Sequence, residues 1–387
     1  MSEVDLKGYL EQARELALSE IRSLIPRDEQ ARRSLYDLVL DYPLREAKGL
    51  RPALCIAACR ALGGQLQAVA PSAAVLELYH NAFLIHDDIE DQSELRRGKP
   101  TLHLQHGVPI AVNVGDAMLA LALQPLLDNT RLLGLGRSLR ILQSVAHMVT
   151  LSVEGQALEL DWIAACNWDV SDSDYCEMVV KKTGWYSFIT PVLVGAIAAG
   201  APSQGMARLA DFARSLSVGF QIQDDILNLE QGRGEYGKEF AGDLWEGKRT
   251  LILLHALREA TPEERWAAEV TLRKPRPLTA LATKRAEGLA ECIDRLVAEG
   301  QLSARGREVL QAAVLVGEPP QVKQPREVDQ LLCLIQKYGS VHYARQCARR
   351  WVDQAAAALG EWSRPLEDSQ HLRFLFGVLS YVVARTR

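Results

Sequence analysis

The sequence predicts an all-α protein built as a single large helical bundle. Apolar residues recur at helical spacing along the whole chain, and no stretch shows a convincing alternation at a period of two. Gly and Pro divide this pattern into roughly ten or more helical segments. No repeat of fixed period and no low-complexity linker separates the segments, so we expect one domain over residues 1–387.

Composition narrows the class of protein. The chain has 387 residues, is 48% hydrophobic and 24% charged, and carries a net charge of -5, so it offers no basic surface for nucleic acid. Seven scattered cysteines without a CxxC pair indicate small buried side chains in a reducing compartment. An acidic N-terminus excludes a signal peptide, and no run reaches the about 18 apolar residues of a membrane span. We therefore expect a cytoplasmic protein without stable membrane insertion.

The first half of the chain contains the most distinctive predicted helix. An amphipathic helix over 4–24 is followed by a second helix ending near residue 42, and a KGLRP segment then leads into an apolar helix that stops at Gly63. Pro71 suits the first turn of the next helix, which runs to an acidic end at 87–91. We expect residues 92–100 to form a polar loop.

The second half continues in the same way. A helix starts at Pro109, a long helix covers about 137–165, and a capped helix leads to Lys182. Pro191 predicts a kink in the apolar stretch that follows. A helix over 203–230 ends in QIQDDILNL, and a glycine-rich loop then precedes further helices that extend to the C-terminus.

The acidic end of the first helix is the strongest candidate site. Asp87 and Asp91 are four residues apart, so they share one helix face, and Asp88 lies beside them. Three carboxylates in one turn repel each other unless a cation is bound, and Mg²⁺ prefers carboxylate oxygens and bridges to phosphates. Taken alone, such a motif is more typical of a solvated helix end, but the preceding Phe83, Leu84 and Ile85 indicate that this helix is largely buried.

A second acidic turn strengthens this interpretation. Asp224 and Asp225 also end an apolar helix, with Asn228 where a third acid would stand. Two such helices can face each other in a bundle core and share a cluster of divalent ions.

Basic residues in loops and at helix ends supply candidate partners for an anionic ligand. Arg makes bidentate phosphate contacts and Lys acts as a point charge. No GxxxxGK[ST] loop and no GxGxxG motif is present, which argues against a nucleotide enzyme of either type. The candidate phosphate ligands are Lys48, Arg51, Arg96, Arg97, Lys182, Lys238 and Lys248.

Two further polar residues share faces with the acids. His80 lies about two turns before Asp87, and Gln221 lies three residues before Asp224. Each is also compatible with an ordinary buried role. We interpret His86 and His103 as structural.

These motifs together closely resemble those of the trans-isoprenyl diphosphate synthases, the polyprenyl synthetase family. The resemblance rests on HDDIED with RRG, FQIQDD, KGLRP, EGKRT and the C-terminal QKYGSVHYARQCARRW, and it covers nearly the whole chain. It implies a class I isoprenoid synthase fold with a central catalytic cavity, a homodimer, and three Mg²⁺ per site. It also implies the condensation of isopentenyl diphosphate with an allylic diphosphate.

The resemblance assigns roles to the candidate residues. Metals on Asp87, Asp91 and Asp224 hold the allylic diphosphate, and Asp88 and Asp225 support the metal waters. The side chains expected around that diphosphate are Arg96, Lys182, Thr183, Gln221, Lys238 and Lys248. Those expected to hold isopentenyl diphosphate are Lys48, Arg51, His80 and Arg97.

The chain departs from the family pattern at three places. Ala47 and Gly49 replace a glycine and a basic residue of the GKRxRP pattern, so one cation near isopentenyl diphosphate is missing. Asn228 replaces the last acid of the second motif. The chain is also longer than usual, and we expect the extra residues in a helical insertion within 262–325.

Product length depends on the residues one turn and more before Asp87. Phe83 shares the face of Asp87 and blocks the expected channel, whereas Ala82 leaves space. This pattern favours a C20 product, geranylgeranyl diphosphate, as made by bacterial short-chain members, over C15 farnesyl or longer chains. The alternative is a floor at Met118 or Leu119.

Two other functions are less consistent with the motifs. A class I terpene cyclase would lack the basic isopentenyl diphosphate site and would carry a different second motif from QDDILN. A regulatory synthase subunit would usually have lost one aspartate motif, and both are largely present here.

Overall fold

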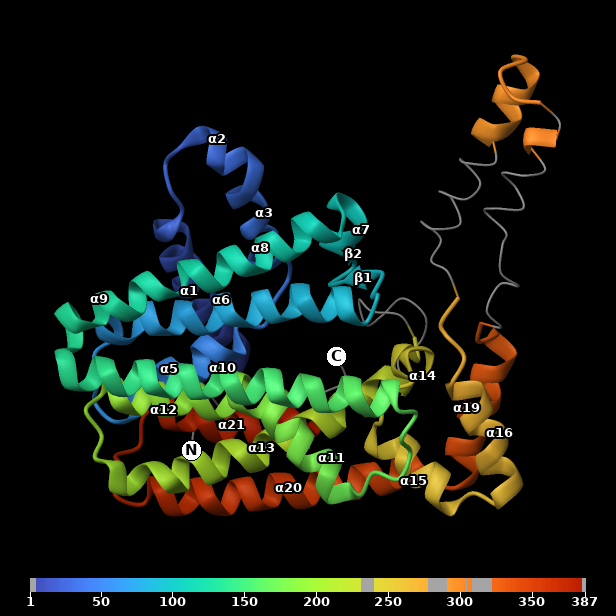
Figure 1. The fold of residues 1–387 in the computed structure, drawn as a ribbon. Coiled ribbons are helices and arrows are strands. Elements are labelled where there is room, and N and C mark those ends of the chain that lie inside the picture. Colours follow the sequence, from blue (N-terminus) through green and yellow to red (C-terminus); the bar gives the residue numbers. More distant parts are fainter. Residues whose placement is uncertain (1–4, 231–239, 278–290, 304, 308–321, 385–387) are drawn as a thin grey trace.

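The computed structural model describes residues 5–230, 240–277, 291–303, 305–307 and 322–384, and it confirms the all-α prediction. Long helices run side by side in a bundle, with shorter helices at one end (Figure 1). The N-terminal part comprises α1 (Leu6–Leu24), a run of short helices α2 (Glu29–Ala31), η1 (Arg32–Tyr36), α3 (Asp37–Val39) and α4 (Asp41–Leu44), then α5 (Leu50–Ala61) and α6 (Leu66–Glu90).

The middle and C-terminal parts complete the bundle. The middle part comprises α7 (Leu102–His106), α8 (Val108–Leu121), α9 (Leu123–Leu133), α10 (Leu135–Ala164), α11 (Asp172–Val179), η2 (Val180–Ile189), α12 (Thr190–Ala198) and α13 (Ser203–Glu230). The C-terminal part comprises α14 (Gly242–Glu246), α15 (Leu251–Glu259), α16 (Pro262–Leu272), α19 (Pro325–Lys337), α20 (Ser340–Ser363) and α21 (Gln370–Ala384).

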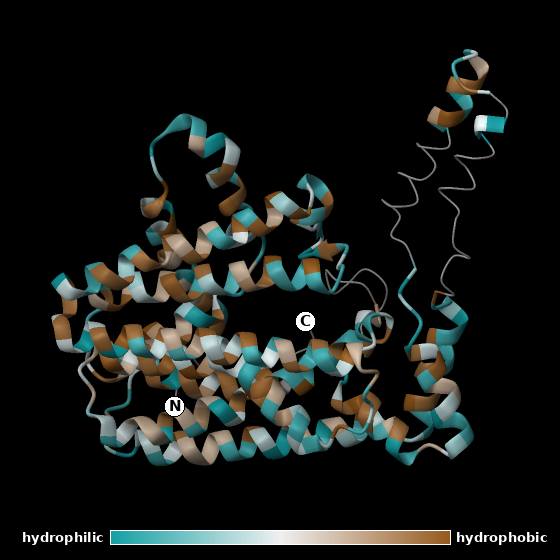
Figure 2. Ribbon diagram, in the orientation of Figure 1, coloured by the Kyte–Doolittle hydropathy of each residue, from teal (hydrophilic) through white to brown (hydrophobic). Residues whose placement is uncertain are grey.

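The core helices are apolar on most of their surface. In α5 every residue from Pro52 to Cys59 is buried, and α6 is buried from Val69 to Ala82 except at Pro71. A helix that is apolar all round belongs inside a protein. Helix α13 packs along α20, and α12 packs along α5. Apolar residues accordingly gather on the inner helices (Figure 2).

Two predicted local features take a different form. Helix α6 begins at Leu66, so Pro71 lies inside the helix rather than in its first turn. The kink expected at Pro191 is a π-helical segment, η2, that ends just before α12, and Pro191 stands in the first turn of α12. π-Helical geometry often marks functional positions, and η2 carries Lys182 and Thr183.

The predicted loop 92–100 contains a small hairpin. Strands β1 (Leu95–Arg96) and β2 (Lys99–Pro100) pair antiparallel. Arg97 and Gly98, between them, have φ of 53° and 72°, as a two-residue hairpin turn requires. Strands of two residues are too short to produce a visible alternation, which explains why the sequence did not predict them.

The prediction about membrane spans needs correction. Two helical stretches, Leu66–Glu90 and Val108–Leu133, are long and apolar enough to cross a membrane by length and composition alone. The first is 78% buried inside the protein, as expected of a core helix, and the second is only 39% buried. The apolar surface of α8 and α9 therefore requires another explanation.

The expected insertion over 262–325 begins with α16, and residues 278–290, 304 and 308–321 of it lie outside the described residues. Helix α16, before residues 278–290, lies beside α19, which follows residues 308–321 (Figure 1), and α19 also contacts α14.

The packing of α12 on α5 yields a test of the fold. A Cβ on Gly195 would collide with the backbone carbonyl of Cys55, so Gly195→Ala should destabilise the protein by about 1–3 kcal/mol. The control is Gly360→Ala in α20, where a Cβ meets nothing within 4 Å. It should be neutral or stabilise by up to about 1 kcal/mol. Urea denaturation measures both, and equal stability of the two variants would contradict this packing.

Candidate active site

A cavity of about 1020 Å³ lies between the ends of α6, α10, η2 and α13. Its wall contains most of the residues that the sequence singled out. They are Lys48, Arg51, His80, Phe83, Asp87, Arg96, Arg97, Lys182, Thr183, Gln221, Asp224 and Lys248. Asp91 and Ala82 are not part of the wall, and Lys238 lies outside the described residues.

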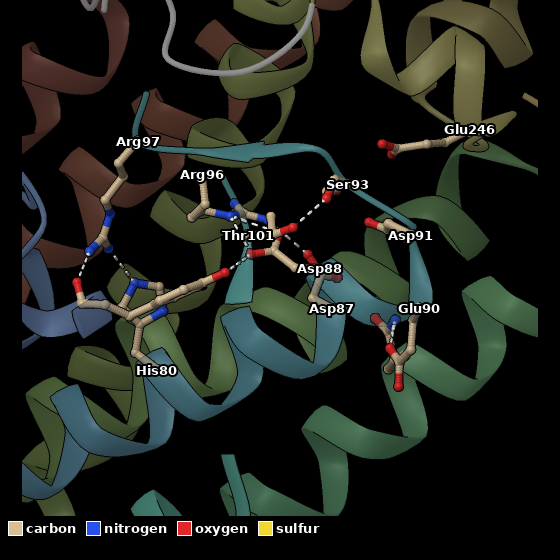
Figure 3. A network of polar contacts seen from close by, with 12 residues as sticks. His80, Asp87, Asp88, Glu90, Asp91, Ser93, Arg96, Arg97, Thr101 and Glu246 are labelled. Atoms are coloured by element: carbon tan, nitrogen blue, oxygen red, sulfur yellow. Dashed lines mark hydrogen bonds and ion pairs between the residues drawn. The ribbon is translucent and has the colours of Figure 1, made fainter. Parts of the chain in front are cut away.

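The second aspartate of the first motif is locked in place. Asp88 is completely buried, and its carboxylate accepts hydrogen bonds from Tyr42 Oη at 2.6 Å and from Arg96 Nε at 2.9 Å (Figure 3). Burial and the neighbouring carboxylate of Asp88 raise the pKa of Tyr42 far above its usual value, so the phenol stays protonated and donates. Arg96 is therefore committed to Asp88, although it also lies 3.5 Å from Asp87.

Asp87 faces the cavity and contacts a cation from another helix. Lys182 Nζ lies 3.2 Å from Asp87 Oδ1, and it also binds the buried carboxylate of Glu159 from α10. Burial alone would lower the pKa of Lys182, but Glu159 and Asp87 raise it overall. The lysine is thus firmly charged. Gly155 allows α10 to approach this point, because a Cβ there would strike the backbone of Lys182.

Asp91 contacts a second lysine, Lys248. Lys248 Nζ contacts Asp91 Oδ2 at 2.5 Å and Glu246 Oε2 at 3.0 Å. Burial raises the pKa of Asp91 to about 7 against the opposing effect of Lys248, and the charge of Asp87 adds to the rise. Asp91 carries its negative charge most readily when a cation is beside it.

The second motif repeats the arrangement of the first. Asp224 lies in the cavity wall, and Asp225 accepts hydrogen bonds from Tyr175 Oη at 2.7 Å and Gln221 Nε2 at 2.9 Å. Burial, and then the charge of Asp243, raise the pKa of Asp225 well above its ordinary value. Thr183 Oγ1 donates to Gln221 Oε1 at 3.2 Å, which links η2 to this turn. In both motifs a buried tyrosine from another helix fixes the second aspartate.

The departure at Asn228 has a local role. Its side-chain oxygen accepts a hydrogen bond from the Asp243 amide at 3.2 Å, and its carbonyl accepts one from the Ala241 amide. Asn228 thereby attaches the start of α14 to α13. Asp243 itself lies in the cavity wall. The sequence shows Asp243 five residues before Lys248 but does not single it out as a site residue. Only the fold brings it into the same cavity wall as Asp87.

Three further cations, from other elements than the two lysines above, lie in the cavity wall. Arg51 Nη2 donates to Ser187 Oγ at 2.6 Å and its guanidinium lies over the Tyr186 ring at 4.8 Å. Arg97 Nη1 donates to the Tyr42 carbonyl at 2.9 Å. Lys48 lies over the Tyr381 ring at 5.6 Å. These three cations form a second basic subsite.

His80 is buried among these cations. Burial, followed by the charges of Arg51 and Arg97, lowers the pKa of His80 well below its ordinary value, so the ring is neutral. Its Nε2 lies 3.4 Å from Arg97 Nη2, and its Nδ1 is buried without a protein partner.

Gly49, the second departure, is required by the backbone. It has φ of 64° at the N-terminus of α5, and a Cβ there would meet Arg14 Cβ at 2.7 Å and the Leu10 carbonyl at 2.9 Å. Close packing of α1 therefore excludes a longer residue at this position.

The apolar part of the wall includes Phe83. Its ring contacts Tyr186 edge-on, with centroids 5.3 Å apart. Ala82 is fully buried, so it reaches the cavity only through its neighbours. Of the two alternative floor residues, Leu119 lies in the wall and Met118 does not. His86, interpreted as structural from the sequence, also lies in the wall.

The donor set suits a hard divalent cation. Among the described residues, no three His, Cys, Asp or Glu side chains form a ready-made metal site. The acids of the wall offer only oxygen donors, from α6 on one side and α13 and α14 on the other. Mg²⁺ is commonly held by one or two carboxylates, with waters and substrate phosphates completing its shell. The residues present therefore fit Mg²⁺ bound together with a phosphate ligand.

Fold and site together define a class of protein: an all-α enzyme whose cavity combines two acidic helix ends with two groups of cations. The comparison with known families agrees with this. The polyprenyl synthetase family model matches residues 33–285, and the chain belongs to this family. It is a polyprenyl diphosphate synthase.

Its relatives differ in the product that their names give. The chain is 36% identical over 238 residues to geranylgeranyl diphosphate synthase of Methanosarcina mazei, covering 58% of this chain and 71% of that protein. It is 34% identical over 217 residues to octaprenyl diphosphate synthase of Escherichia coli, covering 56% and 64%. Membership of the family therefore leaves product length open.

Solved structures resemble the chain over almost its full length. Geranylgeranyl pyrophosphate synthetase from Pyrococcus horikoshii matches with a TM-score of 0.75 at 26% identity, covering 98% of both chains. Geranylgeranyl pyrophosphate synthase from Corynebacterium glutamicum, solved with isoprenyl diphosphate and magnesium, matches at 0.75 and 22% identity, covering 99% of this chain and 100% of that one. The second likeness concerns the fold alone.

Proposed function

We propose that the enzyme condenses isopentenyl diphosphate with an allylic diphosphate, head to tail and in trans, to give C20 geranylgeranyl diphosphate. The observation that carries the proposal is the presence of two separate basic subsites in one cavity. One lies beside the acidic turns, at Lys182 and Lys248, and the other comprises Lys48, Arg51 and Arg97. A reaction between two diphosphate substrates needs two basic subsites, whereas a terpene cyclase binds a single diphosphate substrate and needs one.

The allylic diphosphate belongs at the acidic subsite. Asp87, Asp91 and Asp224 would hold Mg²⁺, three ions in our proposal, which neutralises the diphosphate as it leaves. The oxygen donors of these acids support this choice of metal, because Mg²⁺ prefers carboxylate ligands and bridges to phosphates. Lys182 and Lys248 add positive charge where negative charge develops, with Lys238 as a further expected ligand, and such preorganised charge is a major source of catalysis.

The supporting residues keep the turns in shape. Asp88 and Asp225 are each fixed by a buried tyrosine, so they orient Asp87 and Asp224. The expected contact with metal waters remains open to Asp225, which lines the cavity, but not to the completely buried Asp88. In this scheme Arg96 acts through Asp88, because its guanidinium is already bound there. Thr183 and Gln221 join η2 to the second turn in the same way.

Isopentenyl diphosphate belongs at the other subsite, on Lys48, Arg51, Arg97 and neutral His80. The allylic C1–O bond breaks and leaves an allylic cation. The double bond of isopentenyl diphosphate then attacks C1, and one C–C bond forms. This leaves a positive charge on the isopentenyl unit. The carbon next to that charge loses a proton to the departed diphosphate, and a double bond is restored. Buried helices exclude the water that would capture the cation.

Removing the first aspartate tests the proposal. The wild-type protein should convert isopentenyl diphosphate and dimethylallyl, geranyl or farnesyl diphosphate to longer prenyl diphosphates with Mg²⁺, as followed by chromatography of the products. Asp87→Ala should lower the turnover number by roughly 100-fold or more, because a charge-stabilising ligand is lost.

Three results would decide against this reading. Near-normal turnover in Asp87→Ala would refute the metal role of that residue. A cyclic hydrocarbon from the allylic substrate alone would support the cyclase. No elongation with any of the three allylic substrates would refute the synthase.

The product length follows from Phe83. Its ring narrows the apolar part of the cavity beside Tyr186, so Phe83→Ala should lengthen the main product beyond that of the wild type. Ala82→Phe should shorten the product only by pushing Phe83 or another neighbour into the cavity, because Ala82 is fully buried outside the wall. Mass spectrometry of the products distinguishes the outcomes, and an unchanged product in Phe83→Ala would move the floor to Leu119.

A homodimer explains the exposed apolar surface. Among the described residues, most large hydrophobic side chains with high exposure lie between residues 108 and 153 on α8, α9 and α10. A contiguous apolar surface of this kind usually marks a protein interface. We propose that a second copy of the chain covers it.

Breaking this surface should give monomers. Leu127 is 58% exposed, and Leu127→Arg places a charge that an apolar interface does not tolerate. Analytical ultracentrifugation should show wild type at about twice the chain mass of 42.8 kDa and Leu127→Arg at the single mass. Trp266→Arg, at a 69% exposed residue of α16, is the control and should remain dimeric. A wild-type monomer would exclude the proposed interface.

We also propose a single synthase domain over 1–387 and a cytoplasmic location. The seven cysteines are all free, as in a reducing compartment.

A further inference from the structure

The two chain segments that flank residues 278–321 meet beside the loop from Trp245 to Lys248, which we call the active-site loop because Lys248 lines the cavity. The Lys323 amide donates to the Pro275 carbonyl at 2.9 Å. We call residues 273–277 and 322–324 the two stems. Both run next to the short segment from Trp245 to Lys248, at the end of α14 (Figure 1). The stems thus contact the loop that carries a proposed diphosphate ligand.

The second stem holds the backbone of this loop. Lys323 is only 2% exposed, and its Nζ donates to the Trp245 carbonyl at 2.7 Å. The same Nζ lies 3.5 Å from the position that a Cβ of Gly247 would occupy. Gly247 has φ of 73°, a left-handed conformation that glycine adopts without strain. The turn before Lys248 therefore packs directly on Lys323.

The first stem holds a side chain of the loop. Arg276 Nη1 lies 3.4 Å from Glu246 Oε1, and the Arg276 side chain is 9% exposed. The other oxygen of the same carboxylate, Glu246 Oε2, lies 3.0 Å from Lys248 Nζ. One carboxylate thus connects a stem cation to an active-site cation.

The contacts continue into the acidic turn. Lys248 Nζ contacts Asp91 as well as Glu246, and Figure 3 shows Glu246 on the side of the loop that faces Asp91. The ammonium of Lys248 is therefore shared between two carboxylates. Arg276 and Lys248 share the Glu246 carboxylate, each lying nearer to a different oxygen. Without Arg276, Glu246 would draw Lys248 away from Asp91 and from the cavity.

We propose that the two stems of the insertion position Lys248 for the allylic diphosphate, Arg276 through Glu246 and Lys323 through the backbone of the loop. Arg276, Lys323 and Glu246 are positioning residues in this account, because none of them touches the substrate. The inference rests on the proposed function of the cavity. According to this inference, the stems do more than attach the expected insertion to the helical bundle, because they also position a residue that takes part in the reaction.

Steady-state kinetics of the full-length enzyme test the inference. In Arg276→Met and Lys323→Met, kcat/KM for the allylic diphosphate should fall by roughly 10- to 100-fold, as for other residues that orient a ligand from behind. The KM for isopentenyl diphosphate should stay within about twofold of wild type, because Lys48, Arg51 and Arg97 are untouched. Arg276→Lys should recover part of the loss.

A matched control lies on the same stem. Lys274 is two residues from Arg276 but pairs with Glu327 of α19, so Lys274→Met should leave both kinetic parameters near wild type. An equal loss for both substrates, or no loss in Arg276→Met and Lys323→Met, would mean that the stems only anchor the insertion. Melting temperatures of all variants separate misfolding from a positioning effect, and Arg276→Lys retains the stem charge if Arg276→Met unfolds.

A binding measurement keeps the inference testable if the wild type does not elongate prenyl chains. Inorganic diphosphate with Mg²⁺ can be titrated calorimetrically into wild type, Arg276→Met and Lys274→Met. Weaker binding in Arg276→Met alone supports positioning of Lys248, even if the proposed reaction is wrong. Equal binding in all three overturns the inference.

Discussion

The balance of charge inside one buried cavity governs this structure. Two lysines, Lys182 and Lys248, are each shared between two of the carboxylates of Asp87, Asp91, Glu159 and Glu246. Arg96 and Arg276 add positive charge beside Asp87 and Glu246. A pair of unit charges 4 Å apart interacts by about 4 kcal/mol at the effective dielectric of a protein near its surface. The acids therefore need the lysines when no metal is bound. Mg²⁺ would replace the lysines at the acids, and the lysines would then be available to the diphosphate that accompanies the metal.

Buried contacts between helices fix the positions of these charged side chains. Tyr42 fixes Asp88 and Tyr175 fixes Asp225, so both acidic turns are held from behind by the same kind of contact. Gly155 lets α10 lie against the backbone at Lys182, and this contact brings Glu159 to the lysine. Since α6, α10, η2 and α14 each contribute a side chain to this balance of charge, a shift of any of these helices would disturb the others.

Much of this could be predicted from the sequence, because the strongest signals are local. The helical periodicity predicted the fold class, and most of the acids and cations that the sequence singled out lie in the cavity wall. The long-range pairings could not be predicted. Nothing near Asp91 indicates that Lys248, 157 residues away, lies against it, and nothing near Asp88 indicates Tyr42. Arg96 was predicted as a substrate ligand, and the structure has it bound to Asp88.

Comparison with the family pattern alone did not explain two departures of this chain, Gly49 and the expected insertion. Gly49 appeared as a lost cation, and only the packing of α1 shows why a side chain does not fit there. The expected insertion within 262–325 appeared as extra length of unknown purpose. Its stems contact Glu246 and the turn before Lys248 because the chain returns to the bundle at that point. Such a contact depends on where a segment re-enters the fold, which no local pattern reveals.

The central claim is that the acids and the lysines form one site for a metal-bound diphosphate. The most direct measurement is the affinity of the wild-type protein for inorganic diphosphate with and without Mg²⁺, by isothermal titration calorimetry. The account predicts tight binding with Mg²⁺, and weak binding without Mg²⁺ or in the double variant Asp87→Asn, Asp224→Asn. Equal affinity with and without Mg²⁺ would contradict it.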